Sequence, residues 1–213
     1  MKNLSTVLLA TVSLIGLPHC SSSESKSPTN GGNSASSSDP GEGGVSPVDL
    51  SAYCTATITK DFTVKFLSKD WYTVKSGEKL AIVGRVIGSE AELIRFTKDG
   101  KAYEVDDVPS ENFTSDCGQN TTGDLEIVAL TSVELFSDVQ LSNKLCTVNA
   151  GASYKSNSYG FGSNGGEVYE IFADVLVSAC NSSTGKVFAG FPRISVGNTN
   201  IGSKVFAWLR RKN

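Results

Sequence analysis

Short runs of β-branched and aromatic residues, separated by polar turns, dominate the chain beyond residue 50. Four of these runs have the length and composition of strands, at residues 55–59, 62–66, 80–83 and 92–96. The Asp99-Gly100 pair follows the last of them and is the strongest hairpin signal in the chain. A longer apolar stretch occupies residues 125–136. The pattern predicts a mostly β fold.

Residues 168–179 fit both the helical and the strand period. The helical stripe consists of Val168, Ile171, Phe172, Val175 and Leu176. The alternate positions from Tyr169 to Val177 are equally apolar. We expect a strand over the whole segment, because Gly-rich segments bound it and a turn follows.

The beginning of the chain has a different pattern. Lys2 is the only charged residue before an apolar stretch at residues 4–17, which is too short to span a bilayer. A basic start followed by a short apolar stretch is typical of a cleaved signal peptide. The pattern therefore predicts export.

Cys20 and the residues around it resemble a bacterial lipoprotein signal. Cys20 ends the apolar region, Leu17 stands three positions before it, and a Ser-rich tract follows. The family usually has small residues where this chain has Pro18 and His19. The resemblance implies that residues 1–19 are removed and that Cys20 is lipidated, which would anchor the protein at the bacterial outer membrane or in the periplasm. An ordinary signal peptide that is cleaved nearby is the alternative.

Residues 20–47 predict a disordered tether. Residues 21–44 contain nine Ser, five Gly and two Pro, and Ala35 is their only apolar side chain. Such a segment cannot bury enough apolar surface to offset the entropy lost on ordering. We expect it to hold the folded region away from a membrane surface.

Composition excludes several classes of function. The 213 residues carry a net charge of −3, whereas a nucleic-acid-binding protein would show a basic excess. His19 is the only histidine, so a chain cleaved before Cys20 contains none. Catalytic triads that need a histidine, and zinc or haem sites with histidine ligands, are then impossible. We expect no catalytic residue, no metal and no other cofactor.

The remaining cysteines are expected to form two disulfides, because their number is even and the chain is exported. They are Cys54, Cys117, Cys146 and Cys180. Of the three pairings that remain open, we favour Cys54 with Cys117 and Cys146 with Cys180, since each bridge then lies within one half of the folded region. A four-thiolate metal site is the alternative, but no C-x-x-C pair is present.

Two short motifs recur in the two halves of the folded region. Val-Lys-Ser-Gly at 74–77 matches Val-Asn-Ala-Gly at 148–151, and Asp-Gly-Lys-Ala-Tyr at 99–103 matches Thr-Gly-Lys-Val-Phe at 184–188. This order of turns resembles bacterial SH3-like small barrels. The resemblance implies one or two small disulfide-stapled barrels, with SH3-like β domains at residues 48–124 and 125–213.

Three further motifs carry less weight. Residues 160–165 match G-x-G-x-x-G but lack the acidic partner of a dinucleotide site, so we expect a flexible loop. Residues 116–124 could line a calcium loop with oxygen atoms, although a polar loop anchored by a disulfide explains them better. A hydrolase would need a pair of carboxylates, and no spacing singles out a pair. The candidates are Glu90, Glu92, Asp106, Asp107, Glu111, Glu167, Glu170 and Asp174.

Charged residues are distributed unevenly along the chain. Residues 99–138 contain ten acidic residues and one basic residue, whereas residues 175–213 contain six basic residues and no acidic one. Solvated loops and a basic tail explain this distribution. The functional interpretation is an acidic face that docks a cationic partner and a tail that contacts anionic lipid or glycan.

Four aromatic residues are the candidates for ligand binding: Trp71, Tyr72, Tyr103 and Trp208. In SH3-like modules, loop aromatics such as the Trp71-Tyr72 pair commonly line a ligand groove, and core packing is the alternative.

The sequence thus predicts a membrane-anchored cell-envelope lipoprotein with a non-catalytic β binding module. Its ligand would be a peptide, glycan or protein, with peptidoglycan or an envelope protein as candidate partners and nucleic acid excluded. One alternative is an inhibitor whose acidic segment docks a cationic enzyme. Another is a hydrolase that uses paired carboxylates. No signal in the sequence indicates an oligomeric state.

Overall fold

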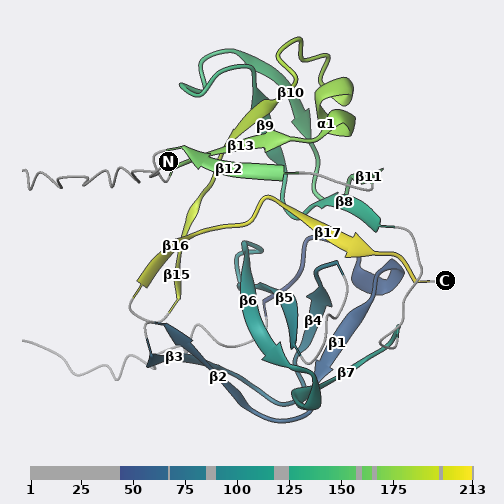
Figure 1. Ribbon diagram of the computed structural model, residues 1–213, viewed down its shortest axis with the longest axis vertical. Helices are drawn as coiled ribbons and strands as arrows, with labels where there is room; N and C mark the ends of the chain where they lie inside the picture. Colours follow the sequence, from purple (N-terminus) through teal and green to yellow (C-terminus); the bar gives the residue numbers. More distant parts are fainter. Residues whose placement is uncertain are drawn as a thin grey trace, which may run out of the picture. The chain divides into compact units, whose positions relative to one another are not determined.

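β-Branched and aromatic residues form strands across most of the region that the computed structural model describes (Figure 1). That region comprises residues 44–66, 68–84, 90–117, 125–156, 160–164, 167–196 and 199–212. It contains 17 strands, one α-helix and two 3-10 helices, so the expectation of a mostly β fold is confirmed. The described residues belong to one compact unit. The signal peptide, Cys20 and residues 20–43 of the expected tether lie outside them.

The first half of the described chain forms an antiparallel sheet of five strands in the order β6-β5-β4-β1-β7. These strands are β1 (Thr55–Ile58), β4 (Lys79–Ile82), β5 (Glu90–Phe96), β6 (Ala102–Pro109) and β7 (Phe113–Ser115). A hairpin of β2 (Phe62–Phe66) and β3 (Lys69–Val74) lies between β1 and β4 in the sequence. Short 3-10 helices precede β1 and β7, at Leu50–Ala52 and Ser110–Asn112. The four predicted strands are all present.

The predicted hairpin connects β5 to β6. Gly100 has a φ of 77°, in the left-handed region where a glycine pays no steric penalty. The backbone N–H of Gly100 donates to Thr97 (3.0 Å), and that of Thr97 donates to Lys101 (2.7 Å). These bonds close the turn and fix the pairing of the two strands.

The second half forms two further sheets. The larger has the order β10-β9-β14-β13-β12, and the smaller has the order β11-β8-β17. The strands of the larger sheet are β9 (Val133–Phe136), β10 (Lys144–Val148), β12 (Gly160–Asn164), β13 (Val168–Phe172) and β14 (Val187–Gly190). Those of the smaller are β8 (Leu125–Ala129), β11 (Ser153–Lys155) and β17 (Phe206–Arg210). A separate hairpin consists of β15 (Arg193–Val196) and β16 (Thr199–Gly202).

Two predictions about local structure are wrong. Residues 168–179 do not form one strand, because the chain leaves β13 and enters the helix α1 (Asp174–Ala179). Asp174 lies in the first turn, where a carboxylate is favourable, and the helical stripe buries Leu176. The G-x-G-x-x-G segment is not a loop: Gly160–Asn164 is strand β12, which pairs with β13.

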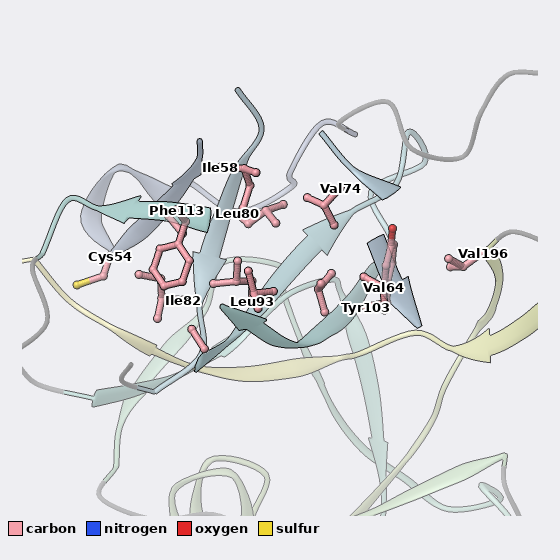
Figure 2. Close-up of a cluster of buried hydrophobic side chains, with 14 of the residues drawn as sticks. Cys54, Ile58, Val64, Val74, Leu80, Ile82, Leu93, Tyr103, Phe113 and Val196 are labelled. Carbon is pink, nitrogen blue, oxygen red and sulfur yellow. The ribbon is translucent and has the colours of Figure 1, made fainter. Parts of the chain in front are cut away.

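Three clusters of buried apolar side chains form the core. The first cluster contains residues from β1, β4, β5, β6 and β7, and Val64 and Val74 from the β2–β3 hairpin (Figure 2). Ile194 and Val196 of β15 also belong to it, although they come from the other half of the chain. The second cluster lies within the second half. The third combines Ile94 and other residues of the first half with Val128 and Leu209.

No sheet in the described part of the chain closes into a barrel, so the closed SH3-like barrels expected from the sequence are not found. Strand β17 pairs with β8 and also bridges to the first half, through Val83 with Leu209 and Tyr53 with Arg211. The expected domain boundary at residue 124 lies outside the described residues. The first and third clusters both contain residues from each side of that position.

Two disulfides join Cys54 to Cys117 and Cys146 to Cys180. This is the sequential pairing that the sequence analysis favoured. Disulfides persist in oxidising compartments, so they indicate an extracytoplasmic location.

Candidate functional site

A bulge in β6 gathers carboxylates at one edge of the first sheet. The register between β5 and β6 shifts between Ala91 and Leu93, so that Asp106 and Asp107 both fall in the region opposite Glu92. Asp107 has a φ of 55°. Both aspartates are exposed, whereas in a regular strand, in which side chains point alternately to the two faces, one of them would point inward. β-Bulges commonly redirect side chains in this way. The result is an exposed group of three carboxylates on two neighbouring strands.

A hollow of about 490 Å³ lies between this bulge and the end of β17. Its lining includes the carboxylates of Glu90, Glu92 and Asp107 together with Trp208, Arg210 and Leu125. The backbone N–H of Gly84 donates to the carbonyl of Trp208 (2.8 Å), which fixes β17 beside the end of β4. The hollow therefore combines an indole ring with a row of carboxylates, and we call it the Trp208 hollow.

A second hollow of about 370 Å³ lies on the other side of the bulge. It is lined by residues of β2, β3 and β6: Phe62, Thr63, Val64, Lys65, Trp71, Glu104, Asp106 and Asp107. Asp107 is common to both hollows. Lys65 supplies a cation here, as Arg210 does in the Trp208 hollow, so each hollow is lined by three carboxylates and one cation.

Desolvation and crowding act on two of these carboxyl groups. Partial desolvation of its carboxyl raises the pKa of Glu92, and the negative charges of Glu104 and Asp106 raise it further. Partial desolvation likewise raises the pKa of Asp106, with Glu104 as the next cause. Lys204 lowers both values but forms its ion pair with Glu104. The Trp208 hollow itself is lined by three carboxylates, Glu90, Glu92 and Asp107, and by one cation, Arg210.

Elsewhere, the acidic segment and the basic C-terminal segment neutralise one another. Besides the pair of Lys204 with Glu104, Arg211 pairs with Glu126 and Lys212 pairs with Asp116. Three of the six basic residues after position 175 are thus bound to acidic residues of the 99–138 segment. The fold therefore pairs part of the basic C-terminal segment with the acidic segment that precedes it in the sequence.

The candidate aromatic residues occupy two places. Trp71, Tyr72 and Tyr103 form one aromatic group, with ring centroids 5.0 Å apart for Trp71 and Tyr72 and 5.8 Å apart for Tyr72 and Tyr103. Tyr103 is fully buried in the first core cluster, and Tyr72 packs against that cluster. Trp71 donates its indole N–H to the carbonyl of Val196 (2.8 Å) and lines the second hollow. Trp208 stands apart and is half-buried in the Trp208 hollow.

The metal-ligating atoms that come closest together in the described part of the chain do not form a free site. The sulfurs of Cys54 and Cys117 and a carboxylate oxygen of Asp116 lie within 4.8 Å of one another. Both sulfurs are bonded in the disulfide, and the carboxylate accepts hydrogen bonds from Thr55 and Lys212. The rest of the calcium loop considered for residues 116–124 lies outside the described residues from 118 onward.

Sequence reasoning included the carboxylates of the site among its candidates but did not group them, and it missed Arg210. One signal was present. In Tyr103-Glu-Val-Asp-Asp-Val108 the polar and apolar residues alternate until two acidic residues stand side by side. Such a doubled polar position within an alternating strand is typical of a bulge. No comparable local signal in the sequence indicates that β17 lies beside the end of β4.

Comparison with protein-family models, with curated proteins and with solved structures finds no match to this chain. Among the described residues, no helix has the length and apolar character needed to span a membrane.

Proposed function

We propose that this protein is an exported, lipid-anchored component of the bacterial envelope whose β region binds a peptide carrying a free amine. Peptidoglycan or an envelope protein would present such a peptide. The Trp208 hollow carries this proposal, because it brings the indole of Trp208 together with the carboxylates of Glu90, Glu92 and Asp107. The signal at Cys20 supports a lipid anchor, and the two disulfides support export.

The charge of the hollow favours a cationic ligand. An ammonium group in the hollow would be attracted by the carboxylates of Glu90, Glu92 and Asp107. The indole of Trp208 offers a surface for the apolar part of the ligand and for cation–π contact. No proton transfer or bond cleavage is required of these residues, so the proposed role is binding without catalysis.

Calorimetric titration with a tripeptide of lysine tests the binding proposal. Glu92→Gln should weaken binding about tenfold, because it removes one charge-assisted contact worth roughly 1.4 kcal/mol. Glu111→Gln is the matched control, since it removes an exposed carboxylate that does not line the hollow. Binding should also weaken as salt is raised. Equal affinity of the wild type for the fully acetylated tripeptide would contradict the proposal.

An acidic surface that docks a cationic enzyme is the alternative use of the same carboxylates. Asp106 and Asp107 are both exposed on the bulge, and this observation favours it. Capture of one basic protein from envelope extract at low salt, together with failure to bind the lysine tripeptide, would favour the inhibitor.

The anchor is tested separately by mass spectrometry of the mature protein. We expect a chain that begins at Cys20 and carries acyl groups. A free, unacylated N-terminus at any other residue would show that the chain is exported without a lipid anchor.

A further inference from the structure

The three-stranded arrangement β4-β1-β7 recurs in the second half as β11-β8-β17. The central strands are β1 and β8. Each pairs on one side with the strand that follows a glycine turn, β4 or β11, and on the other side with the strand that closes the unit, β7 or β17. The registers correspond as well. Thr57 faces Lys79 and Thr114, and Val128 faces Ser153 and Ala207. Thr57 is therefore equivalent to Val128, and the partners of the one are equivalent to the partners of the other.

The glycine turns make the same hydrogen bonds in the two units. Gly77 donates to the carbonyl of Ile58, and Gly151 donates to the carbonyl of Ala129, both at 2.8 Å. The two glycines have φ values of 90° and 81°. The return bonds also agree, because Ile58 donates to Glu78 and Ala129 donates to Ala152, each at 2.9 Å. The first repeated motif of the sequence is thus a repeated structural turn.

The strand that closes each unit enters it in the same way. Thr59 donates to the carbonyl of Asn112 (2.8 Å), and Leu130 donates to that of Val205 (2.9 Å). The next residue is a buried phenylalanine in both cases, Phe113 at 8% exposure and Phe206 at 6%. A glycine turn that recurs by chance would explain the agreement at the turn. It would not explain the shared strand register or the matching entry of the closing strand.

The second repeated motif is not part of this correspondence. Residues 184–188 lead from the segment after α1 into β14, whereas residues 99–103 lead from β5 into β6. In the first unit only the 3-10 helix Ser110–Asn112 separates β6 from β7. In the second, α1, β14, β15 and β16 stand between β13 and β17. The second unit therefore takes its closing strand from the end of the chain, after a long insertion.

The equivalent positions differ at the end of the closing strand. In the first unit the disulfide of Cys54 with Cys117 ties the central strand to the closing strand, with the Cα atoms 5.4 Å apart. The same register places Leu125 opposite Arg210 in the second unit. Both of these residues line the Trp208 hollow. The first unit is thus covalently closed at the position where the second unit borders a hollow.

We infer that the two units are copies of one three-stranded module, and that the second copy binds its ligand at the position that the first copy closes with a disulfide. The ligand is the amine-bearing peptide of the proposed function, on which this part of the inference rests. Trp208 occupies the position equivalent to Ser115, so the second copy also has an aromatic ring where the first has a small hydroxyl side chain. Three differences between the copies, at Leu125, Trp208 and Arg210, thus form the part of the hollow that the second copy supplies, and β5 and β6 supply the carboxylates.

The double variant Leu125→Cys/Arg210→Cys tests the inference. Because these positions correspond to Cys54 and Cys117, we expect a third disulfide to form in the folded protein, seen as a loss of two free thiols. The oxidised variant should bind the lysine tripeptide about tenfold more weakly than Leu125→Ser/Arg210→Ser, which cannot form the third bridge and keeps both native disulfides. Leu125→Cys/Trp208→Cys, which is out of register, is the matched control and should keep its thiols free.

The outcomes separate the two parts of the inference. Free thiols in the folded Leu125→Cys/Arg210→Cys variant under oxidising conditions would overturn the equivalence of the copies. Formation of the disulfide with unchanged binding would overturn the location of the site. A wild type that does not bind the tripeptide would refute the proposed function, while thiol titration would still decide the equivalence. Leu125→Trp keeps the site testable if the double variant does not fold, because it fills the hollow and retains Arg210, and it should also weaken binding about tenfold.

Discussion

Arg211 and Glu126 form a partly buried ion pair that connects the C-terminal segment to both halves of the chain. The Nε and one terminal nitrogen of Arg211 donate to the two carboxylate oxygens of Glu126, each at 3.0 Å. Tyr53, from the first half, donates its hydroxyl to the same carboxylate at 2.9 Å. The side chain of Glu126 is 5% exposed, and that of Arg211 is 46% exposed. Replacement of Arg211 by methionine therefore removes two charge-assisted hydrogen bonds from a buried carboxylate and leaves it with the side chains of Tyr53 and Ser153 as donors.

The expected loss follows from these contacts. Breaking a buried ion pair by removing one partner costs about 3–5 kcal/mol, whereas an exposed pair contributes about 0–1 kcal/mol. Because water reaches the Arg211 side of the pair, we place the cost of Arg211→Met near the lower limit, at about 3 kcal/mol. For a domain of this size, that loss corresponds to a decrease in Tm of about 6–12 °C.

The effect of this substitution should depend on pH. The hydrogen bonds from Arg211 are the main reason that the pKa of Glu126 is lowered in the fold. A lowered pKa means that the pair stabilises the fold above the unfolded-state pKa of about 4.3, and that this stabilisation is lost as the pH falls through the folded-state value. Once Glu126 is protonated, its neutral carboxyl has no charge for Arg211 to compensate. The difference between wild type and variant should therefore be full at pH 7 and shrink below about pH 4.

Urea unfolding followed by tryptophan fluorescence measures this difference at each pH. Lys144→Met is the matched control, because its ion pair with Glu134 is exposed on both sides, and it should cost less than about 1 kcal/mol. A loss for Arg211→Met that equals that of the control would refute the reasoning. So would a loss that is independent of pH, because it would show that packing, and not the charge of Glu126, carries the effect.

Three further substitutions test the cores and one buried hydroxyl. Leu176→Ala should cost about 3 kcal/mol in chemical denaturation, because the side chain of Leu176 is fully buried beneath α1; a loss below 1 kcal/mol would contradict this packing. Tyr72→Phe should raise the free energy of unfolding by about 1 kcal/mol, since the buried hydroxyl has no hydrogen-bond partner in the described part of the chain; a decrease would indicate a partner. Gly202→Ala should lower Tm, because a Cβ at this position would lie 2.5 Å from the ring of Phe191 and the overlap should cost about 1–3 kcal/mol. An unchanged Tm would show that the ring moves aside without cost.

Local signals were sufficient for most strands and for the hairpin between β5 and β6. The Asp99-Gly100 pair predicts that turn because Gly100 must adopt a positive φ, which is a property of a single residue. The same holds for Gly77 and Gly151, whose motif indicated the repeated turn before any pairing was known. Where one residue type has to satisfy one backbone conformation, the sequence is informative.

Features that depend on distant pairing could not be predicted in this way. The segment at 168–179 has two equally good periods, and the split into β13 and α1 is decided by which neighbours cover each face. The charge pattern was interpreted as two separate faces, but β17 and the residues after it bring Arg211 to Glu126 and Lys212 to Asp116. A count of charges along the chain contains no information about such pairing.

Strand β17 links the stability of the fold to the proposed site. It completes the second three-stranded unit, supplies Leu209 to the core cluster shared by both halves, and places Trp208 in the hollow. The ion pair of Arg211 holds the chain immediately after it. A ligand in the Trp208 hollow would contact β17 on one side and the β5–β6 edge on the other, so it would bind the folded chain and not the unfolded one. Ligand binding should then raise the free energy of unfolding by RT ln(1 + [L]/Kd), and Arg211→Met should reduce the apparent affinity only where it populates the unfolded chain.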